Sequence, residues 1–232
     1  MNSETPKYYL RAFRAVNDRE ESLKFFHGHT KVLTDYGIKN LNTAEPGWLS
    51  DPGVYVINAY DNEQEVVGGL RIHIFDGSRS LPVIDALKDL DPRIQDVFDR
   101  TLPEGTAEVC GLWNAKKIFG KGISPLLCIG SVVIVTQLQL NNFFCFSAPY
   151  TEKMIKTNGL IDVTEIGREG KFNYPTEEFV STVLFHPDVE RLEHAHPYNR
   201  DRIKTLTHYK SQVLPEKNPR EEFMVSYELA IA

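Results

Sequence analysis

Cysteine is scarce in this 232-residue chain: Cys110, Cys128 and Cys145 are the only three, and no two of them form a C-x-x-C pair. An odd number of cysteines fits free thiols in a reducing compartment better than a disulfide framework. Apolar runs are also short, since none approaches the roughly 20 residues of a membrane-spanning helix. The polar start MNSETPKYY lacks the apolar segment of a secretory signal. We therefore expect a soluble, cytoplasmic protein without a membrane partner.

Positively charged residues are also fewer than negatively charged ones. The chain has 26 Lys and Arg against 32 Asp and Glu, which gives a formal net charge of −6. No long basic stripe is present, and clustered Lys and Arg supply most of the affinity of nucleic-acid binders. We therefore expect no nucleic-acid partner. Lys116, Lys117 and Lys121 run against the overall balance, and such a local cluster suits an anion, for example a polyphosphate.

Length and composition predict the domain organisation. At 232 residues with 41% hydrophobic residues, the chain is long enough for one α/β domain around a single core. It contains no internal repeat and no low-complexity tract. We expect one domain over residues 1–232, with a helical insertion at about 78–105 and a C-terminal extension at about 187–232.

The first half of the chain alternates strand and helix signals. Tyr8–Val16 is rich in strand-forming residues, and Asp18 is a good N-cap for a helix that Gly37 ends after Tyr36. Two further segments, VYVINAYD and EVVGGLRIHIF, flank Asn62 and predict an antiparallel hairpin. The other elements expected here are a turn-rich loop over 40–53 and a helical excursion over 78–105 that breaks at Asp91-Pro92.

The second half predicts a strand, a glycine-rich loop and a long helix in direct succession. Thr106–Trp113 is the strand, and Ser124 followed by Pro125 makes a suitable N-cap and first helical residue. The helix then runs to about Leu140. Periodicity alone would also allow a strand in this apolar, β-branched segment, but its length and cap favour a buried helix. Further elements are expected as a strand at 143–148, a helix at 151–157 ended by Asn158-Gly159, strands at 160–166, 179–185 and 222–231, and a helical segment at 200–209.

The loop Lys117–Gly122 carries the clearest chemical signal. Glycines at 120 and 122 free backbone N–H groups to turn inward at a helix start, where the helix dipole attracts an anion. The alternative is a solvated turn that happens to be charged. A plain turn needs only one residue with positive φ, so the two-glycine spacing favours a pyrophosphate site.

This segment resembles the cofactor motif of the GCN5-related N-acetyltransferase (GNAT) superfamily, which is Gln or Arg, two residues, Gly, one residue, then Gly or Ala. Lys117, Gly120 and Gly122 occupy those positions, and the resemblance extends over about residues 54–167. It implies an α/β fold with a mixed, largely antiparallel central sheet of about seven strands and flanking helices. It also implies transfer of an acyl group, first of all acetyl, from acetyl-CoA or another acyl-CoA to the amine of a small molecule or amino acid. No metal is required.

The resemblance also assigns cofactor-binding positions. In the superfamily, backbone amides of the loop hold the coenzyme A pyrophosphate, and the strand before the loop contacts the acyl-pantetheine arm where it diverges from the next strand. The diverging segments would be Glu108–Trp113 and Phe143–Ala148 here. The positions implied for the cofactor are Gly111, Leu112, Trp113, Lys117, Ile118, Phe119, Gly120, Lys121, Gly122, Ile123 and Ser124.

Two positions depart from the superfamily pattern. The first motif residue is Lys117 instead of Gln or Arg, and a lysine can still screen phosphates. Many members also place a Tyr four residues before the Gly of a Tyr-x-x-x-Gly-Phe segment, where it protonates the departing thiolate. Here that position is Ile155, followed by Gly159, and Tyr150 is the nearest substitute.

A second resemblance is to the acyl-homoserine lactone synthases, a branch of the same fold. Val67–Arg71, the helical insertion and the strand with Glu108 follow the order of those enzymes. Their strand, however, has Arg three residues after Glu, and Gly111 stands there in this chain. Their Arg-Leu-Leu-Pro-Thr segment is replaced by Arg71-Ile72-His73-Ile74. Generic acyl transfer is therefore favoured over lactone synthesis.

Acyl transfer needs a base, an oxyanion site and an acceptor site. We expect Glu108 to be the base, since burial in a central strand would raise its pKa; the alternative is a strand-end carboxylate that faces solvent or pairs with a cation. Backbone N–H groups of Leu112 and Trp113 would hold the oxyanion if the strand bulges there. Arg71 and His73 would point to one face and hold a carboxylate of the acceptor. Arg71 paired with a neighbouring Glu is the alternative.

Other reactive side chains have structural interpretations. Cys110 and Cys145 have no neighbouring His in sequence and are interpreted as core residues. The pairs His27-x-His29 and His194-x-His196 are interpreted as surface histidines, not metal ligands. Two further hypotheses stay open: a non-catalytic acyl-CoA-binding module of the same fold, and an enzyme of the autoinducer-synthase type whose donor is an acyl-carrier protein. The sequence also leaves a homodimer open.

Overall fold

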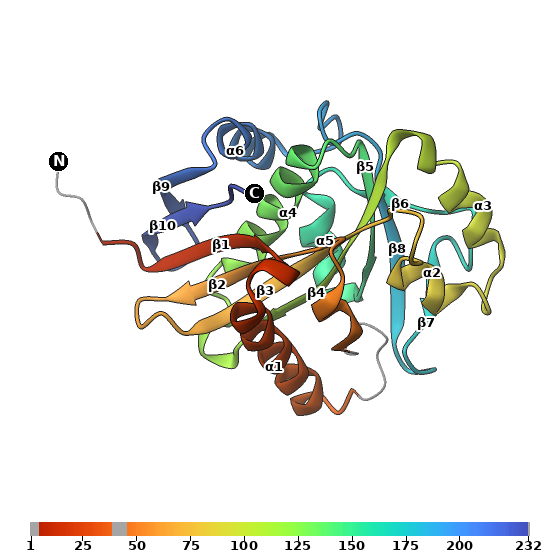
Figure 1. Cartoon of the computed structure of the whole chain (residues 1–232), viewed down its shortest axis with the longest axis horizontal. Helices are drawn as coiled ribbons and strands as arrows, with labels where there is room; N and C mark the ends of the chain where they lie inside the picture. The colour runs from red at the N-terminus through yellow and green to blue at the C-terminus, as the bar shows by residue number, and fades with distance from the viewer. Residues whose placement is uncertain (1–4, 39–45, 232) are drawn as a thin grey trace.

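A computed structural model of the protein describes residues 5–38 and 46–231, so part of the expected loop at 40–53 lies outside the described residues. Helices flank one large mixed sheet (Figure 1). The strands are β1 (Tyr8–Arg14), β2 (Val54–Asp61), β3 (Val66–Ile74), β4 (Thr106–Asn114), β5 (Asn142–Ser147), β6 (Ile161–Asp162), β7 (Lys171–Asn173), β8 (Val180–His186), β9 (Ser211–Lys217) and β10 (Glu222–Glu228). The α-helices are α1 (Arg19–Asp35), α2 (Pro82–Leu87), α3 (Arg93–Asp99), α4 (Ile123–Gln137), α5 (Pro149–Lys156) and α6 (Pro197–His208).

The sheet has the order β6-β8-β5-β4-β3-β2-β1-β10-β9, and β7 pairs with β8 away from this path. All pairings are antiparallel except β1 with β10 and β4 with β5. The expected mixed, largely antiparallel sheet with flanking helices is confirmed. It has ten strands in the described residues, against the expected seven or so. Two strands are not predicted from the sequence: the three-residue β7, and β9, a polar edge strand that contains Pro215.

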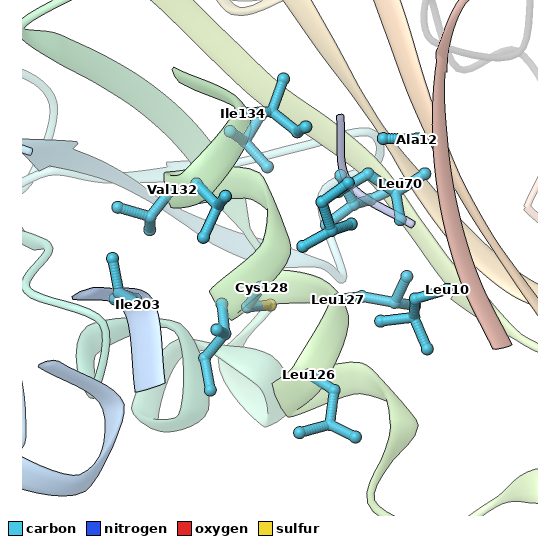
Figure 2. Close-up of a cluster of buried hydrophobic side chains, with 14 of the residues drawn as sticks. Leu10, Ala12, Leu70, Leu126, Leu127, Cys128, Val132, Ile134 and Ile203 are labelled. Carbon is cyan, nitrogen blue, oxygen red and sulfur yellow. The ribbon is translucent and has the colours of Figure 1, made fainter. Parts of the chain in front are cut away.

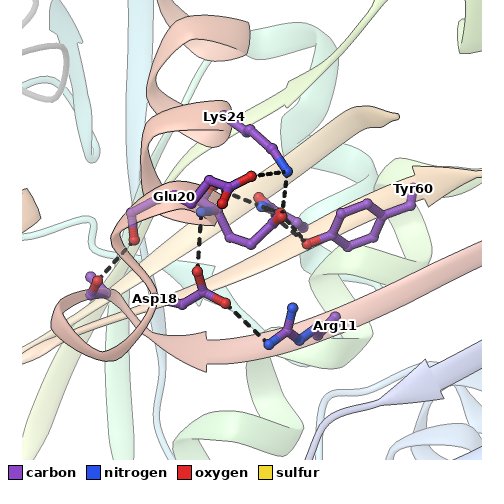
Figure 3. A network of polar contacts seen from close by, with 9 residues as sticks. Arg11, Asp18, Glu20, Lys24 and Tyr60 are labelled. Carbon is purple, nitrogen blue, oxygen red and sulfur yellow. Dashed lines mark hydrogen bonds and ion pairs between the residues drawn. The ribbon is translucent and has the colours of Figure 1, made fainter. Parts of the chain in front are cut away.

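Helix α1 begins and ends as the sequence indicates. The Asp18 side chain accepts a hydrogen bond from the Glu21 N–H, and Gly37 follows the helix with a φ of +71°. Glu21 then ties the helix to the sheet, because its carboxylate accepts from the Tyr60 hydroxyl of β2 at 2.5 Å and from Lys24 Nζ at 2.7 Å. Figure 3 shows Lys24 and Tyr60 pointing toward this network at the first turn of α1. Although burial opposes it, these hydrogen bonds lower the pKa of Glu21. The network fixes the first turn of α1 against β2.

Helix α4 is the buried helix that the sequence predicts, and it lies between the sheet and α6. Figure 2 shows its side chains packed against Leu10 of β1, Leu70 of β3 and Ile203 of α6. This double covering explains why the helix is apolar nearly all round. Even so, no helix in the described ranges is long and apolar enough to cross a membrane.

The ends of α4 differ from the expected ones. The helix begins at Ile123 with Gly122 at the N-cap position, and it ends at Gln137 instead of about Leu140. Ser124 is therefore not the N-cap. Its Oγ instead accepts a hydrogen bond from Asn114 Nδ2 at 2.5 Å, which joins the helix start to the end of β4.

The C-terminal segment supports the glycine loop. Strands β9 and β10 extend the sheet beside β1, and α6 packs on α4 (Figure 1). Between β9 and β10, Asn218 Nδ2 donates to the carbonyl of Lys121 at 3.0 Å. Buried Glu216 anchors this segment, since its carboxylate accepts from the hydroxyls of Tyr198 at 2.7 Å and Tyr227 at 2.6 Å. The loop at the start of α4 is thus held from the far end of the chain.

Candidate active site

Strands β4 and β5 run parallel and separate after only three pairs. The ladder joins residues 106–108 to residues 142–144, whereas β4 continues to Asn114 and β5 to Ser147. The later halves of the two strands therefore diverge, as the expected contact with an acyl-pantetheine arm requires. Polar backbone groups of both strands border this gap.

A cavity of about 210 Å³ lies at this gap. One part of its wall comes from β4 and β5. Another part comes from α4 and α5 on one face of the sheet, with Cys128 and Ile155, and a third from α1 and α2 on the opposite face, with His29 and Val83. The cavity thus connects the two faces of the sheet through the gap between the strands.

Strand β4 bulges beside the cavity. Trp113 pairs with Gly69 and Cys110 pairs with Arg71, so two β4 residues, Gly111 and Leu112, stand opposite one residue of β3. Gly111 has a φ of +63°, a conformation that favours glycine. The bulge on which the expected oxyanion site depends is therefore present.

Glu108 is buried at the cavity wall, with 1% of its surface exposed. Its Oε2 accepts a hydrogen bond of 2.6 Å from the N–H of Val83, in the first turn of α2. Burial raises the pKa of Glu108 to about 8, even though this hydrogen bond and the charge of Arg71 act in the opposite direction. The burial and the raised pKa that we expected are both found, and the side chain is neither solvated nor at a strand end.

Arg71 and His73 lie on one face of β3, as expected, where they pair with Cys110 and Glu108 of β4. Arg71 is fully buried, and its guanidinium carbon lies 4.4 Å from the centre of the Trp48 ring. Neither side chain is among the residues that the structure places in the cavity wall. The pair therefore lies behind the wall, next to the bulge, and does not face an acceptor in the cavity as we expected.

His29 is the site residue that sequence reasoning missed. It lies on α1, is only 4% exposed and contributes to the cavity wall, whereas His27 is exposed. Burial, together with the charge of Arg71, lowers the pKa of His29 to about 3. The interpretation of His27-x-His29 as a surface pair is thus wrong for His29. The sequence offers no signal that separates the two histidines, because Phe25 lies four residues before His29 and Leu23 lies four residues before His27.

The glycine loop has the backbone geometry that the motif suggests. Gly120 has a φ of +71° and stands third in a turn that the Lys121 N–H closes on the Ile118 carbonyl at 3.1 Å. Gly122 has a φ of +86° and precedes the first turn of α4. A Cβ added to Gly120 would meet no atom within 4 Å, so the outer side of the turn is open. Two residues with positive φ exceed what a plain turn needs.

The side chains of the loop differ in their surroundings. Ile118 and Ile123 are buried, so only their backbones can reach a ligand, whereas Phe119 is 44% exposed. Lys117 Nζ lies 2.6 Å from Asp61 and 2.8 Å from Glu65 of the β2–β3 hairpin.

Lys116 Nζ likewise lies 3.3 Å from Asp35. Within the described residues Lys121 makes no such ion pair. The positive cluster that the sequence indicates is therefore largely balanced by neighbouring carboxylates.

Helix α5 presents an apolar side chain where the superfamily pattern places a tyrosine. Ile155 is buried and lines the cavity. Tyr150 belongs to the same wall but is 80% exposed, so it lies at the mouth of the cavity. Ile155 therefore faces the cavity, and Tyr150 is present only as a solvent-exposed phenol.

The three cysteines all line the cavity and are all buried. Burial raises the pKa of Cys110 and that of Cys128 to about 12, so these groups stay as thiols at neutral pH. The expectation that they are core residues is confirmed. Across the two described ranges, no group of three or more His, Cys, Asp or Glu residues is arranged to hold a metal ion.

Comparison with known proteins adds information at the level of the fold. No protein-family model matches the sequence, and no curated protein matches it. Among solved structures, FeeM, an N-acyl amino acid synthase from uncultured soil microbes, superimposes with a TM-score of 0.62 at 13% identity, covering 84% of this chain and 97% of FeeM.

Two further structures are similar at lower scores. Escherichia coli ElaA has a TM-score of 0.54 at 9% identity, covering 76% of this chain and 97% of ElaA. BjaI, a CoA-dependent acyl-homoserine lactone synthase solved with SAM and isopentyl-CoA, has a TM-score of 0.53 at 12% identity, covering 94% of this chain and 96% of BjaI. At these identities the similarity shows the fold.

Proposed function

We propose that this chain, which has the fold of the GCN5-related N-acetyltransferases, transfers an acyl group from acyl-CoA to the amine of a small molecule or amino acid. One observation carries the proposal: the gap between β4 and β5 opens into a cavity that joins both faces of the sheet beside a bulge and a buried carboxylate. The descriptions of FeeM as an N-acyl amino acid synthase and of BjaI as CoA-dependent support it.

Acyl-CoA would bind along β4 and the loop that follows it. The pyrophosphate would lie against backbone N–H groups from Gly120 to Ser124, where the first turn of α4 adds its dipole. The open side of Gly120 fits such a group, because no side chain occupies that space. The pantetheine arm would then enter the gap beside Gly111, Leu112 and Trp113.

In the proposed reaction, Glu108 removes a proton from the acceptor ammonium, and the neutral amine attacks the thioester carbon. The C–N bond forms as the carbonyl becomes an oxyanion, which the N–H groups of the bulge at Leu112 and Trp113 stabilise. The C–S bond then breaks, and the second proton that the positively charged nitrogen must lose passes to the departing thiolate, directly or through Tyr150 or water, so that the products are an amide and a thiol. A thiolate whose thiol has a pKa of about 8.5 is a weak base and a good leaving group that takes its proton readily from solvent at neutral pH, so Ile155 does not prevent turnover.

The apolar wall of the cavity favours acyl groups longer than acetyl. The aliphatic and aromatic side chains that line it include Leu70, Phe143, Ile155 and Leu160. Each buried methylene contributes about 0.8 kcal/mol, which corresponds to about fourfold in affinity. We therefore expect the Kd measured by calorimetry to fall about fourfold per methylene from acetyl-CoA onwards, until the chain fills the cavity.

A substitution in the cavity wall tests where the acyl chain of the cosubstrate lies. Ile155→Trp fills part of the cavity, so it should weaken binding of long acyl-CoA and leave that of acetyl-CoA unchanged. Equal affinity of the unmodified protein for acetyl-CoA and octanoyl-CoA would show that the cavity does not hold the acyl chain.

The glycine loop gives a direct test of cosubstrate binding. Acyl-CoA should raise the melting temperature, and Gly120→Glu should abolish that rise because it places a negative charge in the phosphate site. Gly77→Glu is the control, since Gly77 also has a positive φ of +84° and open space around it but lies in another loop. Both variants carry the same backbone strain and charge, so loss of the rise in both would assign the effect to strain or charge alone. No rise in the unmodified protein with any acyl-CoA would contradict the proposal.

The buried Ile155 gives one reason to consider a non-catalytic acyl-CoA-binding module. A thiol-release assay with a panel of amines separates the two functions, since binding without release from any acceptor would support the module. An acyl-carrier protein as donor has weaker support, because Lys116 and Lys117 are already paired with carboxylates. Strong salt dependence with a carrier protein, but not with coenzyme A, would support that donor.

A further inference from the structure

His29 is a buried polar side chain without a partner in the cavity wall. It is 4% exposed, and within the described chain its ring nitrogens make no hydrogen bond. Other polar groups of the wall are satisfied: Ser131 Oγ donates to the Cys128 carbonyl at 2.8 Å, and Asn158 Oδ1 accepts from Asn199 Nδ2 at 3.0 Å. The ring nitrogens of His29 are not fully enclosed by protein, so they are open to the cavity and available to hydrogen-bond a ligand there.

The surroundings of His29 place that ligand near the bulge. The His29 ring lies 5.8 Å from the ring of Phe25, one helical turn earlier on α1. Phe25 in turn covers the bulge, since its Cζ lies 3.6 Å from the position of a Cβ on Gly111. A ligand of His29 would therefore lie within a few residues of the site proposed for the thioester carbonyl.

His29 and Glu108 approach the cavity from the same side. The side chains of Glu108 and Arg71 are on the face of the sheet that α1 and α2 cover, whereas α4 and the glycine loop are on the opposite face. If acyl-CoA enters from the loop side, the α1 side is left for the acceptor. A neutral imidazole, which burial next to a cation favours, offers one lone pair to an N–H donor.

We propose that His29 binds the acceptor amine, accepting a hydrogen bond from its N–H and holding the nitrogen between the imidazole and Glu108. This inference rests on the proposed acyl transfer and names a residue that contacts the acceptor. The ligand class is a primary amine. No covalent bond to His29 forms or breaks: the proton that the ammonium loses before attack goes to Glu108, and the second proton leaves the nitrogen as the thiolate departs.

The test varies the amine at saturating acyl-CoA and measures thiol release. A panel of amino acids and alkylamines first identifies the best acceptor for the unmodified protein. His29→Leu keeps the bulk but removes the acceptor atom, and we expect its KM for that amine to rise about 10- to 100-fold, as loss of one buried hydrogen bond implies. The Kd for acyl-CoA should stay unchanged.

Conservative variants separate binding from packing. His29→Asn and His29→Gln carry a carbonyl oxygen near the positions of Nδ1 and Nε2, and at least one of them should bring KM back to within about threefold. An unchanged KM in His29→Leu would overturn the inference, and so would equal losses in all three variants. Both outcomes leave the proposed function standing, since the unmodified protein still turns over. No thiol release from the unmodified protein with any amine would overturn both.

Discussion

Glu108→Gln is expected to abolish acyl transfer and at the same time to make the folded protein more stable at pH 8. The activity falls because a glutamine amide cannot accept a proton, and loss of a general base typically costs about 10²- to 10⁴-fold. The fold should survive, because the amide oxygen of the new glutamine can still accept the hydrogen bond that the Val83 N–H donates to Glu108. Below pH 8 the buried acid is mostly neutral, so a glutamine resembles it in shape and charge.

The gain in stability follows from the raised pKa. An ordinary Glu has a pKa of 4.5, and burial raises that of Glu108 to about 8. Between these values the folded state binds more protons than the unfolded state, so the wild-type protein loses stability as pH rises from 4.5 to 8. The full loss is about 5 kcal/mol at about 1.4 kcal/mol per pH unit. The glutamine of the variant does not titrate, so its stability advantage should grow with pH over this window and level off above it.

Urea unfolding at pH 5, 6, 7 and 8 measures the difference in stability between the variant and the wild-type protein. A pH–rate profile tests the predicted role of Glu108 as the base. Thiol release by the wild-type protein should increase with pH and reach a plateau above about 8, because Glu108 must be ionised to act as a base. Glu190→Gln changes an exposed carboxylate and is the matched control. A stability difference that does not change with pH would show that Glu108 titrates normally, and full activity of Glu108→Gln would assign the base to another group.

Local sequence signals predict most of the fold because the residues that favour each element locally are also the residues that its tertiary packing requires. The β2–β3 hairpin, the buried helix α4 and the Asp91-Pro92 break all follow from residue type and spacing. The failures lie where tertiary contacts override propensity. Strand β9 contains Pro215 and forms because β10 pairs with it, and Ser124 is not the N-cap because Asn114 binds its hydroxyl.

The candidate site was predictable only in part, for a similar reason. Glu108 could be found because it lies in a predicted central strand, where burial raises the pKa of a carboxyl group, whereas the bulge at Gly111 entered only as a condition for the oxyanion site. His29 could not be separated from His27 without knowing which face of α1 is buried, since residues two apart on a helix point about 200° apart. The place of Arg71 behind the wall depends on Trp48, a contact that no local pattern encodes.

Gly28→Ala is expected to destabilise the protein and disable the site, although Gly to Ala within a helix usually stabilises by up to about 1 kcal/mol. A Cβ on Gly28 would overlap Cη2 and Cζ2 of the Trp113 indole, far inside contact distance. Helix α1 or the indole must therefore move, and overpacking of this kind costs about 1–3 kcal/mol. Because α1 carries His29 next to Gly28, the same shift should lower kcat/KM for the amine.

A second substitution shows whether this contact is the cause. Trp113→Phe removes the distant atoms of the indole, together with a buried Nε1 that has no partner in the described chain. The double variant should be more stable than the sum of the two single effects predicts, by about 0.5–3 kcal/mol, and should recover activity towards the amine. Gly47→Ala is the control, since no atom lies within 4 Å of its added Cβ. Additive effects in the double-mutant cycle would contradict the clash between the new Cβ and the indole. The close approach of Gly28 to Trp113 would then not determine the position of His29.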